Sequence, residues 1–184
     1  SSITSDGQII VDGGVTSNGN TILDGQSIAI HSNGVVQGDS STTVHSQEKV
    51  NNNGLINSGN TTTINAKSID NNEGGRIYGD TVDIKANIVT NHTNSEIEER
   101  YHKAGKELEK AKNELDAEWN ADISKYKTKL ELDAHRQRIN DLTKAYDDVQ
   151  EKVTALKAEL DSYKSGVIAG RNHVNITSDT IDNT

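Results

Sequence analysis

Short apolar pairs and alternations recur along most of the chain, separated by glycine or asparagine. Gly34, Gly54 and Gly75 recur at a nearly constant spacing, and each is followed by a short, mostly apolar step. Each repeat holds about three apolar clusters, which predicts three brief strands per coil, with turns at residues that tolerate positive φ. Antiparallel hairpins are the competing interpretation. A fixed period near 20 favours a stacked coil, in which no repeat buries its apolar face alone.

The repeat is interrupted once. The next copy begins only at Gly166, several periods after Gly75, so a long segment between them lies outside the repeat. We therefore divide the chain into β-helix rungs over 1–94, a helical insert over 95–165, and a rung that resumes over 166–184.

Helical spacing of apolar residues is clearest in the second half of the insert. There the steps alternate between three and four, which is the heptad seam of a coiled coil. The seam residues are Ile139, Leu142, Tyr146, Val149, Val153, Leu156, Leu160 and Tyr163. In the first half, the steps from Ala111 through Leu115 and Trp119 to Ile123 are all four, which predicts a stutter in the seam. We expect Trp119 and Tyr126 to be seam residues.

The ends of the insert carry helix signals. Residues 95–98 form a capping-box pattern, and residues 164–166 predict the helix end with Gly166 at the C-terminal cap. A single helix of this length would span roughly 105 Å and would not return to the repeat. We expect an antiparallel coiled-coil hairpin with arms of roughly 33 residues and a turn near 128–134. Residues 128–131 offer a second capping box, and Asp133 is another possible cap.

Composition supports stacked strands. The chain has no Pro, Cys, Met or Phe, one Trp, 31% hydrophobic residues and a mean hydropathy of −0.74. Its interior must therefore be built from Ile, Val, Leu and small residues, which pack well on a pleated surface. Disorder is the alternative, and the regular apolar positions argue against it. The absence of cysteine excludes disulfides and thiolate metal sites.

The chain begins at Ser1 and has no apolar stretch long enough for a signal peptide or membrane span, so we expect an excerpt of a longer protein. The formal net charge of −9 argues against a nucleic-acid partner.

Charge is sorted along the insert. Residues 123–139 carry five cations against two carboxylates, whereas the whole insert has 14 cations and 17 carboxylates. A basic hairpin tip could contact an anionic surface such as lipopolysaccharide or acidic receptor loops. Ordinary solvated helix faces are an equal alternative. The candidate receptor-binding residues are Lys125, Lys127, Lys129, Arg136, Arg138 and His135.

Other candidate sites are weaker. The six histidines share no metal-ligand spacing, and we expect them at the surface. Asp80 with Asp83, and Asp179 with Asp182, could form the carboxylate pairs of a polysaccharide-cleaving β-helix. Without an aromatic sugar platform we interpret them as turn and solvent residues. No nucleotide-binding or nucleophile motif is present, and we expect no enzyme activity, cofactor or metal.

Two segments carry a family resemblance. GLINSGNTTTINAKSIDN (54–71) and GVIAGRNHVNITSDTIDN (166–183) resemble the degenerate repeats of filamentous-haemagglutinin-type exoproteins of Gram-negative bacteria. These include two-partner-secretion adhesins and contact-dependent growth inhibition effectors. The resemblance is good over 34–94 and 166–184 and loose over 1–33. It implies a right-handed parallel β-helix that extends from the producing cell and is exported by an outer-membrane transporter partner.

From these features we expect a monomeric cell-surface or secreted exoprotein segment. Its β-helix acts as a shaft, and its hairpin recognises an outer-membrane protein or lipopolysaccharide on a neighbouring cell. Three alternatives stay open: a purely structural spacer, a β-helical glycan-processing enzyme, and a trimeric autotransporter stalk.

Overall fold

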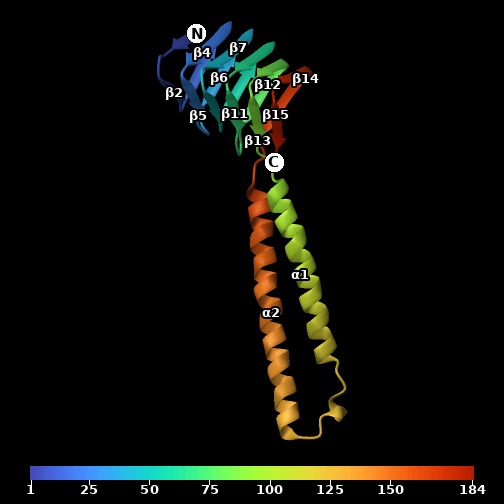
Figure 1. Ribbon diagram of the computed structural model, residues 1–184. Coiled ribbons are helices and arrows are strands. Elements are labelled where there is room, and N and C mark those ends of the chain that lie inside the picture. The colour runs from blue at the N-terminus through green and yellow to red at the C-terminus, as the bar shows by residue number, and fades with distance from the viewer. The chain divides into compact units, whose positions relative to one another are not determined.

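The computed structural model describes residues 1–184 and divides into two compact units. One comprises Ser1–Asn94 with Lys164–Thr184, and the other is Ser95–Tyr163. The first is a parallel β-solenoid of about four turns and the second is a helical hairpin (Figure 1). A stacked coil with a helical insert is therefore confirmed, and the antiparallel-strand alternative is wrong, because every strand pairing is parallel.

The solenoid strands are short, with few exceptions. They are β1 (Ser2–Thr4), β2 (Gln8–Val11), β3 (Gly14–Ser17), β4 (Asn20–Gly25), β5 (Ser27–Ile30), β6 (Val35–Gly38), β7 (Ser41–Ser46), β8 (Lys49–Asn52), β9 (Leu55–Ser58), β10 (Thr61–Asn65), β11 (Ser68–Asn71), β12 (Arg76–Lys85), β13 (Ile88–Asn91), β14 (Val167–Thr177) and β15 (Thr180–Asn183). Strands β2, β5, β8, β11, β13 and β15 form a six-stranded sheet, and the others form a nine-stranded sheet. The long strand β12 pairs with both β9 and β10, so it joins the two rows of the larger sheet.

The core consists of ladders in which each turn places a similar side chain at the same position. One ladder runs through Leu23, Val44, Ile64 and Ile84. A second joins Val36, Ile56 and Ile77, and a third joins Ile28, Val50, Ile69 and Val89. All of these side chains are buried. β-Branched residues dominate because they pack closely on neighbours of the same shape.

The recurring glycines are required for close approach between turns. A Cβ on Gly54 would overlap the carbonyl oxygens of Gly34 and His31, and one on Gly166 would lie 2.6 Å from the carbonyl oxygen of Asn71. The sequence analysis placed the turns at residues that tolerate positive φ, but Gly74 is the only residue that adopts it. The regular spacing of the glycines therefore results from close packing of the backbones of successive turns at one corner of the coil.

A ladder of asparagine side chains continues the same corner inside the solenoid. The side-chain amide of Asn52 donates to Asn71 Oδ1 at 2.7 Å, that of Asn71 donates to Asn91 Oδ1 at 2.7 Å, and that of Asn91 donates to Asn183 Oδ1 at 2.8 Å. Asn52 and Asn71 are fully buried. Each amide also donates to a backbone carbonyl of the corner, so the buried polar groups are satisfied.

The hairpin consists of α1 (Ser95–Trp119), a 3₁₀ turn η1 (Ile123–Lys125) and α2 (Lys129–Ser162). The helices lie side by side (Figure 1), and cross-helix ion pairs join Arg100 to Glu159 at 3.1 Å and Lys152 to Glu107 at 2.8 Å. Both pairs join the first half of α1 to the second half of α2, as an antiparallel hairpin requires.

The helix boundaries differ from the expected ones. The turn lies between Trp119 and Lys129 rather than near 128–134, and the arms have 25 and 34 residues rather than two equal lengths. The second capping box is confirmed. At the start of α2 the Thr128 hydroxyl accepts a hydrogen bond from the Glu131 amide, and the Glu131 carboxylate accepts one from the Thr128 amide. The expected C-terminal glycine cap is wrong. Helix α2 ends at Ser162 with Tyr163 extended, and Gly166 belongs to the solenoid corner.

We predict that Gly54→Ala destabilises the solenoid by about 1–3 kcal/mol, because the added methyl group forces stacked backbones apart. The control is Gly13→Ala, where a Cβ would meet nothing within 4 Å. Urea unfolding followed by the amide I infrared band of the sheet measures the free energy of unfolding. Equal stability of the two variants would contradict the close-approach account.

We predict that Asn71→Ala costs about 1–3 kcal/mol, because it leaves the buried Asn52 and the half-buried Asn91 without their hydrogen bonds to Asn71. Asn51→Ala, at the neighbouring outward-facing position of β8, serves as the control and should change stability by less than about 0.5 kcal/mol. The same infrared unfolding measurement applies. An Asn71→Ala variant as stable as the control would show that the ladder contributes nothing.

Candidate functional site

The seam predicted for the second arm is confirmed. The eight seam residues from Ile139 to Tyr163 are buried or half-buried, whereas most of their neighbours are exposed. The same alternation of steps continues towards the start of α2, through Leu132 and His135. His135 therefore occupies a position that faces α1.

The seam of the first arm keeps the heptad spacing without a stutter. Its buried or half-buried members are Ile97, Tyr101, Ala104, Leu108, Ala111, Leu115 and Glu118. After Leu115 the next seam position is the carboxylate Glu118, and Trp119 lies outside the seam with 67% exposure. The expected stutter and the expected seam role of Trp119 are both wrong, because a polar pair fills the last layer of the seam.

That layer is built on His135, which is 6% exposed. Its Nδ1 lies 2.7 Å from Oε1 of Glu118 and 3.1 Å from the Tyr126 hydroxyl. Because an ionised carboxylate only accepts, we assign the proton to Nδ1, which donates to Glu118. Arg138 Nε lies 3.2 Å from the other oxygen of Glu118. The expectation of surface histidines is therefore wrong for His135.

This layer also holds the turn between the helices in place. The Tyr126 and His135 rings lie 4.7 Å apart between centroids, so the returning chain packs on α2 through Tyr126, which is half-buried. The hydrogen bond from His135 is the main cause that lowers the pKa of Glu118, with the Arg138 charge adding to it. The cluster is an anchor of the hairpin tip, which we define as residues 119–138.

Two carboxylates of the tip stabilise its backbone. Asp122 accepts from the Ser124 amide at 2.9 Å and caps η1. Glu131 accepts from the amides of Thr128 and Lys127, at 2.9 and 2.8 Å. Hydrogen bonds from Ser124 lower the pKa of Asp122, and those from Thr128 and Lys127 lower the pKa of Glu131.

The candidate cations of the tip fall into two groups. Arg136 pairs with Asp133 at 3.4 Å, and Arg138 pairs with Glu118. The other three are exposed lysines that form no ion pair: Lys125, Lys127 and Lys129. The Lys125 ammonium lies 5.1 Å from the centre of the Tyr126 ring, and Lys127 Nζ donates to the Ser124 carbonyl at 2.9 Å. The receptor-binding role of these residues stays a prediction.

Three large apolar side chains of the tip are exposed, which the sequence interpretation missed. Trp119 is 67% exposed, Ile123 is 62% exposed and Leu130 is 80% exposed. They are the only large hydrophobic residues of the hairpin that are exposed, and they come from the end of α1, from η1 and from the start of α2. The heptad register could have revealed Trp119, since it follows the seam position of Glu118.

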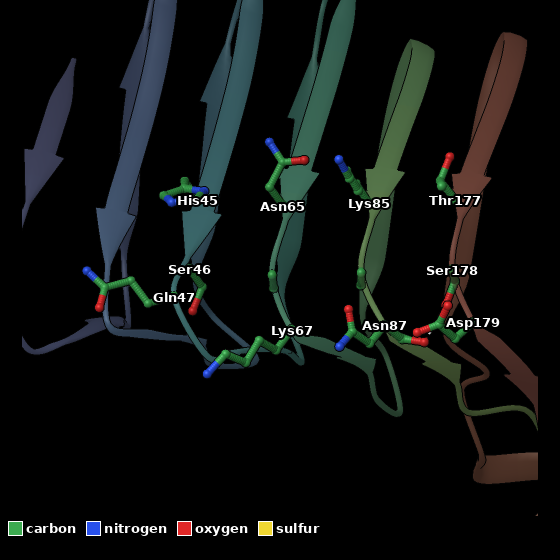
Figure 2. Close-up of a pocket in the computed structure, with 12 residues that line it drawn as sticks. His45, Ser46, Gln47, Asn65, Lys67, Lys85, Asn87, Thr177, Ser178 and Asp179 are labelled. Carbon is green, nitrogen blue, oxygen red and sulfur yellow. Dashed lines mark hydrogen bonds between the residues drawn. The ribbon is translucent and has the colours of Figure 1, made fainter.

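A shallow groove crosses the solenoid where the strands of the larger sheet end, with a volume of about 610 Å³ (Figure 2). One side of the groove is lined by strand residues in register on successive turns, which are His45, Asn65, Lys85 and Thr177. The other side is lined by Gln47, Lys67, Asn87 and Asp179. Its charges are mixed, and Lys67 is already paired with Glu48 at 2.6 Å. The groove presents no concentrated charge of one sign.

The first pair of carboxylates considered for glycan chemistry is partnered. Asp80 pairs with Arg171, and Asp83 accepts a hydrogen bond from Asn175 at 2.7 Å. No cluster of three or more His, Cys, Asp or Glu side chains is placed to hold a metal ion. Neither helix combines the length and apolar character that a membrane-spanning helix needs.

Comparison with known proteins gives no match to this chain, either among family models, among curated proteins or among solved structures.

We predict that the Glu118–His135 layer makes the stability of the hairpin fall as the pH is lowered. A carboxylate with a lowered folded pKa stabilises the fold above its unfolded pKa, near the usual value of 4.5, and that contribution is lost as pH falls through the folded pKa. Thermal melting of the helical circular dichroism signal should therefore show wild type above Glu118→Gln at pH 6, with the gap closing below pH 4. Glu109→Gln, at an exposed position of α1, is the control. A gap that persists unchanged at low pH would contradict the role of ionised Glu118.

Proposed function

We propose that this chain is a segment of a filamentous-haemagglutinin-like exoprotein at the surface of a Gram-negative bacterium. Its β-solenoid is a right-handed shaft whose rungs follow the period of the glycines, and its helical hairpin recognises a receptor on a neighbouring cell. The receptor is an outer-membrane protein or lipopolysaccharide, and the contact serves adhesion or toxin delivery in contact-dependent inhibition. Export uses an outer-membrane transporter partner, and the chain acts as a monomer without enzymatic activity.

The observation that carries this proposal is the way the solenoid closes at the insertion point. The Gly166 amide donates to the His92 carbonyl at 2.7 Å, and the Asn91 side chain donates to the Gly166 carbonyl at 3.0 Å. The strands on both sides of the insert thus meet at one corner, where preceding turns connect with a few residues such as 72–75. The stacking does not need the hairpin, and a large segment that the scaffold does not need is where binding functions are commonly carried.

The hairpin tip supports recognition at that segment. Its lysines form no ion pair, its apolar residues are exposed, and its turn is held by caps and by the His135 layer. A rigid turn presents these side chains at low entropic cost on binding.

A spacer role is the second candidate, favoured by the ion pairs of Arg136 and Arg138 within the hairpin. Charge reversal at these two arginines would then leave cell binding unchanged, whereas a direct receptor contact predicts its loss.

We predict that replacing residues 95–163 with a short Gly-Ser link keeps the solenoid folded and abolishes binding to susceptible bacterial cells. The hydrogen bond between His92 and Gly166 shows that such a link has little distance to span. Retention of the parallel-sheet infrared band is the folding control, and flow cytometry with fluorescent protein measures binding. Binding that survives the deletion would contradict the receptor role of the hairpin.

A further inference from the structure

We propose, building on the proposed function, that the hairpin tip docks on an anionic lipid surface. Trp119, Ile123 and Leu130 insert among the headgroups, and Lys125, Lys127 and Lys129 contact lipid phosphates. The partner is the phosphorylated lipid of the target membrane rather than a protein.

The exposed apolar side chains of the hairpin are confined to its turn. All three exposed large hydrophobic residues of the hairpin fall within the short segment 119–130, while the seam covers the others. A tryptophan accompanied by aliphatic side chains suits the membrane interface, where its amphipathic ring lies at headgroup depth.

The apolar residues of the turn are accompanied by charged ones. Within residues 119–131 the two carboxylates, Asp122 and Glu131, accept hydrogen bonds from backbone amides, and neither forms an ion pair, although the Lys125 charge acts on Asp122 from a longer distance. The three lysines lie between the apolar positions along the turn and form no ion pair. Their charge is not neutralised by an ion pair, although Lys127 also donates to the Ser124 carbonyl, and their long stems can reach lipid phosphates while the neighbouring apolar groups insert.

The kind of cation separates a lipid from a protein partner. Protein interfaces are enriched in arginine and depleted in lysine, because the guanidinium makes bidentate contacts. Here both arginines of the tip are ion-paired within the hairpin, and only lysines are free of ion pairs. Lysine-rich segments beside aromatic and aliphatic residues are typical of binding to anionic membranes.

Trp119 is the only tryptophan of the chain, so its fluorescence reports on the tip directly. We expect its emission to shift to shorter wavelength, and acrylamide quenching to fall, when the full chain is mixed with vesicles of equal parts phosphatidylglycerol and phosphatidylcholine. Vesicles of phosphatidylcholine alone should leave both unchanged. Each lysine near an anionic surface contributes about fivefold to partitioning, so Lys→Gln at 125, 127 and 129 should weaken it by about a hundredfold.

The matched control replaces Lys106, Lys110 and Lys112 with Gln, which removes the same charge from exposed positions of α1. It should partition like wild type. A second variant, Ile123→Ser with Leu130→Ser, keeps the tryptophan and changes only exposed positions, and it should lose most of the fluorescence shift.

Three results would overturn the lipid assignment. They are an unchanged emission with both kinds of vesicle, equal weakening by the control variant, and a shift that follows protein concentration without lipid, which would indicate self-association. Cell binding distinguishes this failure from failure of the proposed function. A chain that binds cells through its hairpin but ignores vesicles contradicts the anionic-lipid assignment and leaves the proposed function standing, whereas cell binding that survives deletion of the hairpin removes the proposed function itself.

Discussion

The structure depends on the close stacking of one turn on the next at a single corner of the coil. At that corner backbone lies directly on backbone, with Gly34, Gly54, Gly75 and Gly166 in successive turns. The asparagine ladder beside them ties side chains of one turn to those of the next and to corner carbonyls. The strand pairings of a parallel solenoid join residues about one turn apart in the sequence, so the register between turns must be fixed by such repeated contacts.

The same constraint explains where a helical unit can be added. Strands β13 and β14 are separated by the whole hairpin, yet the contacts at the corner are of the same kind as in earlier turns. Asn71 donates across the insertion to the carbonyl of Val167 at 3.3 Å, and His92 accepts from Gly166. The two helices of the hairpin pack on their own seam, and the solenoid turns before and after the insertion stack on each other. The terminal polar layer of the hairpin holds the turn that carries the exposed side chains of Trp119, Ile123 and Leu130.

The coil, its interruption and the seam of α2 could be predicted from the sequence because each rests on regular spacing. The reason for the glycines could not, since the oxygen atoms that exclude a Cβ belong largely to residues of the preceding turn. The role of Asn71 needed the register for the same reason. In the hairpin, the spacing of apolar residues favours Trp119 over Glu118 as the seam residue. Only the position of His135 on the facing helix explains why the carboxylate Glu118 occupies the last seam position. With Glu118 in the seam, Trp119 is exposed and the turn begins directly after it.

We propose that the hairpin tip, and not the groove of the solenoid, contacts the target cell. Hydrogen exchange of the full chain, with and without outer-membrane vesicles from susceptible cells, tests it most directly. We expect slower exchange confined to residues 119–131, where the lysines and exposed apolar side chains lie. Protection of residues 45–47, 65–67 and 85–87 with an unchanged tip would place recognition in the groove and contradict the claim.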